Sequence, residues 1–490
     1  MHHSLQNHMP HDAIEALVQH VRDSNRDITA IRAADADKKD TYATTLAQFE
    51  TQRGGTLWYP YIGSGRGNGA LVELLDGSVK YDLISGIGVH WGHSQPQLLK
   101  ATLEAALGST IMHGNLQQDM LSVQLIGLLT QNSGFPHAFL STSGAMANEN
   151  ALKLAFHHHP GRTRVLAFER CFMGRTMTLA SITDKAAYRE GLPATIAVDY
   201  LPFYDATCPE KSVQKLAEYL HRYPGQHAAL CLELIQGEGG YYPAPASFFK
   251  QLIDIAKAAD ISILVDEVQT FGRTESLFAS QSLGLIDDID ILSVGKLLQV
   301  CATLFRSSHK PKPGLISQTF TGSSTALAAG ISILTQLTEE PYLGPHGKIM
   351  TISGMFRERL TALASRYPGS IHGPFGYGSM IAFTPFGGSA KEAKDLCMQL
   401  FTNGIIGFIA GADPVRVRFL LPMGGIQESD LDPIFQHIEM ALSSGLSREF
   451  EGTHTAANGE GVRTLNVNNP LLGGAGVGKA HPHNKKESYS

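Results

Sequence analysis

The sequence predicts an α/β protein with a large domain built around a mostly parallel sheet and a smaller α+β domain towards the C-terminus. Between about residues 97 and 330, short β-rich runs alternate with helical patterns. Such alternation predicts a parallel sheet whose two faces are covered by helices. From about residue 342, a helical pattern over residues 349–366 precedes further mixed pattern up to about residue 449. That change of pattern predicts the second, smaller domain.

The strands predicted for the large domain are short runs bounded by turns or helical patterns. They cover residues 137–142, 164–168, 228–234, 261–265 and 289–294. Between the third and fourth runs, residues 248–259 carry apolar side chains at helical spacing, which predicts an amphipathic helix. A small-residue turn after the first run leads into a further helical run over residues 147–156.

Outside this domain, changes of pattern divide the chain further. Residues 1–60 are polar with helical patches, and we expect them to form an N-terminal arm. Residues 61–96 contain a hairpin pattern around the turn Asp76-Gly77-Ser78, and we expect them to belong to the small domain. The remaining divisions are 97–340 for the large domain, 341–449 for the C-terminal small domain and 450–490, which has few large apolar residues, for a disordered tail.

Composition narrows the class of protein. The 490 residues are 43% hydrophobic and 17% charged, as in ordinary globular proteins, and the formal net charge of −6 argues against nucleic acid or a membrane as a partner. The N-terminus lacks a secretory pattern. Five cysteines without a CxxC pair predict reduced core residues of a cytoplasmic protein, with no disulfide and no metal site. For His157-His158-His159 we favour a solvated helix end over a metal site.

Asp266 and Lys296 are the most informative residues. Asp266 follows a predicted buried strand, and ligands of parallel α/β sheets bind at the carboxyl ends of strands. Lys296 is the only charged residue between Asp290 and Arg306, in a largely apolar run. Desolvation would lower the pKa of its ammonium and free the amine as a nucleophile. A nucleophilic lysine and a carboxylate that can hold a pyridinium proton are what pyridoxal phosphate requires.

Three further segments could contribute to a site, although each is weak alone. Residues 141–145 (Ser-Thr-Ser-Gly-Ala) form a small-residue turn before a helix, which can hold a phosphate. Residues 171–176 place Phe172 three positions before Arg175, a ring to stack and a guanidinium to bind a carboxylate. Residues 233–240 form an acidic, glycine-rich loop after a strand.

Taken in order, these segments, followed by residues 319–322 (Thr-Phe-Thr-Gly), resemble the class III aminotransferases, which act largely on ω-amino acids and have the fold type I of pyridoxal-phosphate enzymes. The resemblance covers roughly residues 60–445. It implies a large cofactor-binding domain with a mostly parallel sheet sandwiched by helices, a smaller α+β domain, and pyridoxal 5'-phosphate as the cofactor.

The resemblance also implies how individual residues act on the cofactor. Gly144 and Ala145 would bind the phosphate through their N–H groups, while Phe172 and Val268 would enclose the pyridine ring. Gln269 would reach the phenolic oxygen. Asp266 would pair with the ring nitrogen, and Lys296 would form the Schiff base and shuttle the proton. The implied cofactor-binding set is Ser143, Gly144, Ala145, Phe172, Asp266, Val268, Gln269, Lys296 and Thr319. Thr319 would reach the phosphate of the neighbouring subunit, which implies a homodimer.

Three residues resemble the family's substrate-binding positions. Arg175 would hold the carboxylate-bearing end of the amino donor, and Arg418 would bind the α-carboxylate. Arg416 is the alternative to Arg418. Glu238 would pair with this arginine when an ω-amine occupies the site. The implied reaction is a ping-pong transfer of an amino group from an ω-amino donor to an α-keto acid, with 2-oxoglutarate as the expected acceptor.

Two other functions are compatible with the fold. One is a pyridoxal-phosphate aminomutase, against which Arg175 argues. The other is a catalytically inactive homologue that serves as a binding subunit, against which the survival of Lys296, Asp266 and Arg418 argues. The donor stays open among acetylornithine, ornithine, lysine, 4-aminobutyrate and longer amines. The segment that follows Lys296, residues 297–301, is similar to lysine ε-aminotransferases.

Overall fold

The structure, a computed structural model, describes the backbone of residues 11–455 and the side chains of residues 11–443. Contacts between residues divide the chain into two units, Met1–Ser447 and Arg448–Ser490. Most of the predicted tail, residues 456–490, lies outside the described residues, as do residues 1–10 of the predicted arm. The division into five segments stays a prediction.

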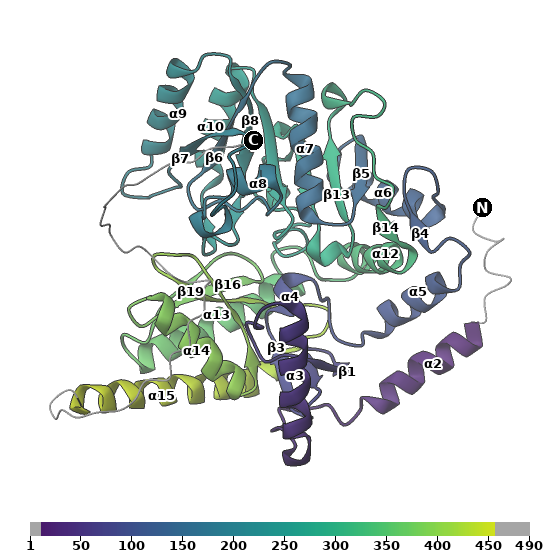
Figure 1. Cartoon of the computed structure of the whole chain (residues 1–490), viewed down its shortest axis with the longest axis vertical. Coiled ribbons are helices and arrows are strands. Elements are labelled where there is room, and N and C mark those ends of the chain that lie inside the picture. Colours follow the sequence, from purple (N-terminus) through teal and green to yellow (C-terminus); the bar gives the residue numbers. More distant parts are fainter. Residues whose placement is uncertain (1–10, 456–490) are drawn as a thin grey trace, which may run out of the picture. The chain divides into compact units, whose positions relative to one another are not determined.

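A seven-stranded sheet forms the centre of the large domain (Figure 1). Its order is β5-β13-β12-β11-β8-β6-β7, and every strand runs in one direction except β13, which is antiparallel to β12 and β5. The predicted, mostly parallel sheet is therefore confirmed. Its strands are β5 His137–Ser141, β6 Arg164–Phe168, β7 Ala197–Leu201, β8 His227–Leu232, β11 Ser262–Glu267, β12 Ile291–Val294 and β13 Cys301–Phe305.

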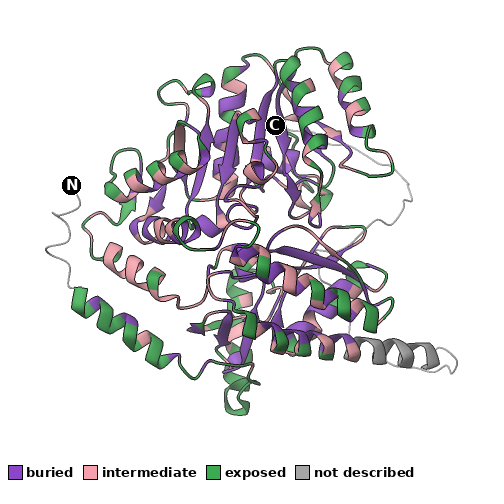
Figure 2. Ribbon diagram, turned by 180° about the vertical axis from the view of Figure 1, so that it is seen from behind, coloured by how far each residue is buried: buried purple, intermediate pink, exposed green. Residues whose placement is uncertain are grey.

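Helices cover both faces of this sheet. Along β6, Val165 and Ala167 pack into the cluster that contains the helix α7 (Gly144–His158), whereas Leu166 and Phe168 pack into the cluster that contains α10 (Ala246–Ala258). Alternate residues of a strand point to opposite faces, so α7 and α10 lie on opposite sides. Figure 2 shows the sheet buried between the exposed outer faces of the helices. The other helices here are α5 Pro96–Ala106, α6 Met120–Ser133, α8 Met177–Ile182, α9 Lys211–Arg222, α11 Ala279–Ser282 and α12 Ser324–Glu339.

Besides two two-stranded sheets, β10-β9 (Tyr242–Pro243 and Ile235–Gln236) and β14-β4 (Gly322–Ser323 and Met112–His113), the described residues contain two four-stranded sheets. One has the order β1-β2-β3-β17, in which the predicted hairpin appears as an antiparallel pair of β2 and β3. The short β17 pairs in parallel with β3, which joins the N-terminal hairpin to a C-terminal strand. The other sheet has the order β15-β16-β19-β18. The strands are β1 Gly63–Asn68, β2 Leu71–Leu74, β3 Val79–Asp82, β15 Ile371–Phe375, β16 Met380–Pro385, β17 Ile405–Ile406, β18 Phe408–Ala410 and β19 Arg416–Leu420.

Helices flank these smaller sheets and the N-terminal region. The predicted helix over residues 349–366 is present as α13 Lys348–Arg366. Helix α14 (Ala390–Thr402) begins with a capping box, because the Ser389 hydroxyl accepts from the Glu392 N–H and the Glu392 carboxylate accepts from the Ser389 N–H. The further helices are α2 His11–Ser24, α3 Lys39–Arg53, α4 Ser85–Gly88, α14 Ala390–Thr402 and α15 Leu431–Thr455. No helix among residues 11–455 is long and apolar enough to cross a membrane.

Two sequence-based predictions about single residues need correction. All five cysteines are free and four are buried, but Cys208 is partly exposed, in a loop where its Sγ lies 3.3 Å from Glu210 Oε1. The end of α7 is not fully solvated either. His159 is buried and its Nε2 lies 3.0 Å from Ser262 Oγ, while the ring of His158 stacks on that of His309.

Candidate active site

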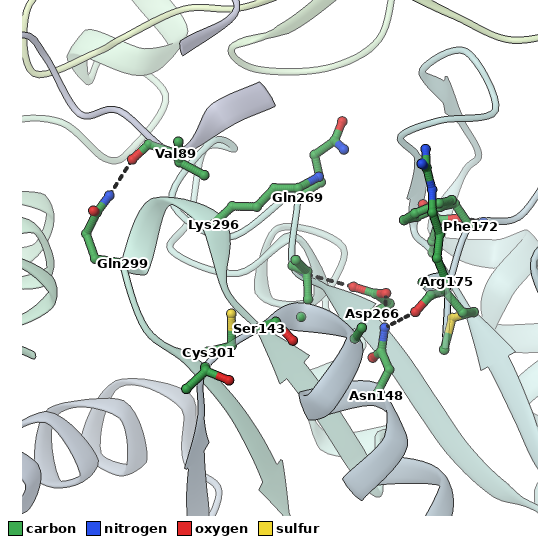
Figure 3. A pocket seen from close by; sticks show the side chains of 17 residues that line it. Val89, Ser143, Asn148, Phe172, Arg175, Asp266, Gln269, Lys296, Gln299 and Cys301 are labelled. Atoms are coloured by element: carbon green, nitrogen blue, oxygen red, sulfur yellow. Dashed lines mark hydrogen bonds between the residues drawn. The ribbon is translucent and has the colours of Figure 1, made fainter. Parts of the chain in front are cut away.

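A cavity of about 450 Å³ opens at the carboxyl ends of β5, β11 and β12 (Figure 3). This edge of a parallel α/β sheet is where ligands bind. The cavity brings together residues that are up to 212 positions apart along the chain, from Val89 to Cys301. Of the residues predicted for the site, those that line it are Ser143, Gly144, Ala145, Phe172, Arg175, Asp266, Val268, Gln269 and Lys296. Glu238, Arg418 and Thr319 are not among its lining residues.

Asp266 presents a desolvated carboxylate to the cavity. Its Oδ1 accepts from the Val268 N–H at 2.8 Å, and its Oδ2 accepts from Asn148 Nδ2 at 2.6 Å. Burial raises the pKa of Asp266, while the bonds from Val268 and Asn148 and the charge of Lys296 act in the opposite direction. Both hydrogen bonds come from neutral donors, so the carboxylate can still pair with a cationic N–H placed in the cavity.

Lys296 lies two residues after β12 and reaches the same cavity. Burial is the largest cause that lowers the pKa of its ammonium to about 8, followed by the positive charges of Arg418 and Arg273. The free amine, which is the nucleophilic form, is therefore more populated near neutral pH than in an exposed lysine. Lys296 also has a φ of +49°, and such strained backbone at a non-glycine residue is typical of functional sites.

The N-terminus of α7 forms one wall of the cavity. Ser143 caps the helix, its hydroxyl accepting from the Met146 N–H at 3.2 Å. A Cβ on Gly144 would lie 2.7 Å from Val268 Cγ1, so only glycine lets the helix approach the loop after β11 this closely. The first N–H groups of a helix and its dipole together favour an anion such as phosphate.

Phe172 and Gln269 complete the part of the cavity predicted to hold a ring. Phe172 follows β6, and its N–H donates to Glu233 Oε2 at 2.8 Å, which fixes the loop that carries the aromatic side chain. The amide oxygen of Gln269 is buried without a hydrogen-bond partner among the described residues. A buried amide group that lacks a partner is suited to a polar group of a bound ligand.

Sequence reasoning missed Asn148 and gave Glu233 no role. Asn148 lies one turn into α7, where its Nδ2 donates to Asp266 and to the Met173 carbonyl at 2.8 Å, and its Oδ1 accepts from Ser293 Oγ at 2.6 Å. Its position four residues after Gly144, on the same helix face, was the available signal. Burial, followed by the charge of Asp266, raises the pKa of Glu233 to about 8.

Glu238 and Arg418 form a buried ion pair. Arg418 Nη2 donates to Glu238 Oε2 at 2.8 Å, and Arg418 Nη1 donates to the Gly237 carbonyl at 3.1 Å. The side chain of Arg418 is 1% exposed, yet its charge lowers the pKa of Lys296 in the cavity. The alternative, Arg416, is engaged elsewhere, since its guanidinium covers the rings of Tyr242 and Phe375. The geometry therefore favours Arg418 over Arg416.

Thr319 is exposed in the structure. It lies beside Gly114, at which an added Cβ would meet the Thr319 carbonyl oxygen at 1.9 Å. Backbone hydrogen bonds from Asn115 to Gln318 and from Thr321 to His113 fix this arrangement. The predicted contact of Thr319 with the cofactor phosphate of a neighbouring subunit stays a prediction.

The known proteins that are similar to this chain include several aminotransferases. An acetylornithine aminotransferase from Caldanaerobacter subterraneus is 28% identical over 390 residues, which span 77% of this chain and 94% of that protein. One from Bacillus anthracis is 35% identical over 279 residues, 55% of this chain and 68% of that protein. The solved ornithine aminotransferase of Toxoplasma gondii ME49 superposes with a TM-score of 0.72 at 25% identity, over 82% of this chain and 95% of that one.

The family profile described as aminotransferase class-III matches residues 58–442, most of the chain. The cavity fits the cofactor of that family, because it combines a helix N-terminus for the phosphate, a carboxylate without a cationic hydrogen-bond partner for the ring nitrogen, and a lysine whose pKa is lowered by burial. The chain therefore belongs to the class-III aminotransferases, fold type I transaminases that use pyridoxal 5'-phosphate to transfer an amino group from a small-molecule donor to a keto acid.

Proposed function

We propose that this enzyme takes the amino group of an ω-amino donor and passes it to 2-oxoglutarate in a ping-pong cycle. The observation that carries the proposal is the Glu238–Arg418 pair beside the cavity. A buried arginine paired with a glutamate suits two substrates in turn, provided that the glutamate moves aside for a substrate carboxylate. Glu238 would neutralise Arg418 while an ω-amine reacts, and the α-carboxylate of the keto acid would replace Glu238 in the second half-reaction.

The residues that line the cavity would each have a separate role in this reaction. Bound pyridoxal phosphate supplies an electron sink for the bond that breaks at the substrate carbon. Lys296 Nζ would bond to the cofactor and then move the proton between the substrate carbon and the cofactor carbon. Asp266 would keep the ring nitrogen protonated, and the N–H groups at the start of α7 would bind the phosphate. Arg175 lines the cavity and would bind a carboxylate at the far end of the donor.

N-Acetylornithine is our first candidate donor, because the relatives reported above carry the name acetylornithine aminotransferase. Purified enzyme is supplied with 2-oxoglutarate and, in turn, with N-acetylornithine, ornithine, lysine or 4-aminobutyrate, and the glutamate formed is measured. We expect the most glutamate with N-acetylornithine. The same screen decides against the alternatives. An aminomutase would isomerise an amine without forming glutamate, and an inactive binding subunit would turn over none of the donors.

Replacing Glu238 with glutamine should damage the ω-amine half-reaction more than the glutamate half-reaction. The variant leaves Arg418 buried and unpaired while an ω-amine binds, which costs about 3 kcal/mol. L-Glutamate brings its own carboxylate to Arg418 and avoids this cost. Single-turnover rates with each amine, followed by cofactor absorbance, measure the difference. Equal losses with both amines would remove the case for a switch.

We also propose that the active unit is a homodimer in which Thr319 reaches the cofactor phosphate of the partner subunit. Around Thr319 the surface is apolar, with Ile111 60% exposed, Met112 55%, Leu116 fully exposed and Phe320 44%. The pairing of β4 (Met112–His113) with β14 (Gly322–Ser323) brings these side chains from two segments together. An exposed apolar cluster of this kind is typical of a protein interface.

Replacing Thr319 with valine should weaken cofactor retention by about tenfold or more, because a hydrogen bond to a charged group contributes roughly 1.5–3 kcal/mol. Equilibrium dialysis of the cofactor measures retention, with Thr361→Val on the exposed face of α13 as the control. Sedimentation tests the assembly itself. Removal of the cofactor should loosen the dimer, since a ligand bound across the interface stabilises the assembled state. A fully active monomer would refute the proposal.

The cysteines support a location in the cytoplasm, which we add to the proposal. All five are free, including Cys208, which is only partly buried. Free thiols persist where the environment is reducing. Fractionation of cells that express the intact chain checks this, and recovery outside the cytoplasmic fraction would contradict it.

A further inference from the structure

The carboxylate of Glu238 is bound on two sides. Its Oε2 accepts from Arg418, whereas its Oε1 accepts from Lys185 Nζ and from Tyr188 Oη, each at 3.1 Å. Lys185 Nζ also donates to Tyr188 Oη at 3.0 Å, which closes a triangle around Oε1. Glu238 can therefore lose its bond to Arg418 and keep a cationic partner.

Lys185 and Tyr188 are held in place by the loop that carries the predicted substrate-binding residues. Lys185 directly precedes a short 3-10 turn (Ala186–Tyr188) just after α8, and Tyr188 is the last residue of that turn. Immediately before it, Thr183 Oγ1 donates to the Gly174 carbonyl at 2.9 Å and accepts from the Met173 N–H at 3.0 Å. These bonds tie the turn to the loop between Phe172 and Arg175.

Tyr188 connects this turn to the cavity. The guanidinium of Arg175 lies 3.9 Å from the centre of the Tyr188 ring, and the ring of Phe172 meets the Tyr188 ring edge to face at 6.2 Å. The Tyr188 hydroxyl points instead to Glu238. One side chain thus contacts the ring-stacking residue, the donor-binding arginine and the glutamate.

Charge balance explains what the triangle can do. A substrate carboxylate that binds Arg418 displaces Glu238, which would leave a second carboxylate close by without a partner. An unpaired, partly buried charge is costly. With Lys185 present, the state bound to the keto acid contains two neutral pairs, the substrate with Arg418 and Glu238 with Lys185.

We propose that Lys185 and Tyr188 are positioning residues that hold Glu238 while Arg418 binds the carboxylate of the keto acid. This inference rests on the proposed switch between Glu238 and Arg418. In the ω-amine half-reaction Glu238 stays on Arg418, so Lys185 matters little there. In the glutamate half-reaction Lys185 is the remaining cation for Glu238. Loss of Lys185 should thus affect the half-reaction with L-glutamate more than the half-reaction with the ω-amine.

The test uses Lys185→Met, which keeps the length of the side chain and removes its charge. Holoenzyme is mixed with L-glutamate or with N-acetylornithine, and the half-saturating concentration is taken from single-turnover changes in cofactor absorbance. We expect it to rise about fivefold for L-glutamate, a modest change because Lys185 is 36% exposed, and by less than about twofold for N-acetylornithine. Tyr188→Phe, which keeps the ring beside Arg175, should also raise the half-saturating concentration of L-glutamate, but by a smaller factor.

Two controls separate this role from a purely structural one. Lys185→Arg keeps the positive charge and should bind L-glutamate nearly as the wild type does. Lys250→Met, on the exposed face of α10, should leave the half-saturating concentrations of both amines unchanged. In the double variant with Glu238→Gln, the effect of Lys185→Met should disappear, because residues that act through one another are not additive.

Other outcomes would overturn the inference. A larger loss with N-acetylornithine than with L-glutamate would mean that Lys185 binds the donor itself. Full additivity in the double variant would mean that Lys185 does not act through Glu238. If Glu238→Gln alone still discriminates between the amines, only the role of Lys185 falls. If Glu238→Gln affects both equally, the switch itself fails. If the enzyme does not react with N-acetylornithine, the proposal that this compound is the donor is wrong. The half-saturating concentration of L-glutamate would then still test the role of Lys185.

Discussion

Lys296→Ala is expected to lower kcat by at least about a thousandfold while the protein stays folded. The side chain would supply both the bond to the cofactor and the proton transfer, and a positioned acid–base group alone contributes about 10² to 10⁴. Its pKa of about 8 leaves a reactive amine in the wild-type enzyme, which alanine cannot replace. The assay measures turnover of the amino donor that the screen for glutamate formation identifies.

The assignment of Lys296 can be checked independently of activity. Borohydride reduction of the holoenzyme, followed by peptide mapping, should place the cofactor on Lys296. Lys257→Ala, a change on α10 away from the cavity, serves as the matched control and should keep full activity. Recovery of the label on a different lysine, or high activity in Lys296→Ala, would contradict the role.

Much of the large domain could be predicted because its strands and helices have distinct patterns. The predicted strand over residues 164–168 matches β6, and the predicted helix over 248–259 is shifted by two residues or less from α10. Strands β7 and β13 were missed. All five residues of β13 are buried and face neighbours on both sides, so it shows no alternation of polar and apolar residues.

The site was more predictable than its supporting contacts. Asp266 and Lys296 are reactive groups at strand ends, and the sheet topology brings such positions together at one edge. Asn148 contacts Asp266 and Lys185 contacts Glu238, each from another element, across separations of 118 and 53 residues. Nothing local to either residue reveals its partner, because the contact exists only once the chain has folded.

Asp266→Asn should reduce kcat by about a hundredfold or more, a loss of the size seen when a positioned proton-transfer group is removed. The amide has nearly the shape of the carboxylate but carries no charge to keep the ring nitrogen protonated. It also has one acceptor oxygen for two donors, the Val268 N–H and Asn148 Nδ2, so one of these is left facing an amide NH₂.

The loss should appear in the chemical step and not in the fold. Rapid-mixing traces with L-glutamate should show slower proton transfer. The melting temperature should fall only slightly, because the new contact between two donors is offset by removal of a charge that burial opposes in the folded state. Asp254→Asn, an exposed change on α10, controls for loss of a carboxylate. A nearly normal rate in Asp266→Asn would show that a different group faces the ring nitrogen, and Glu233, the other acidic residue lining the cavity, would be the residue to replace next.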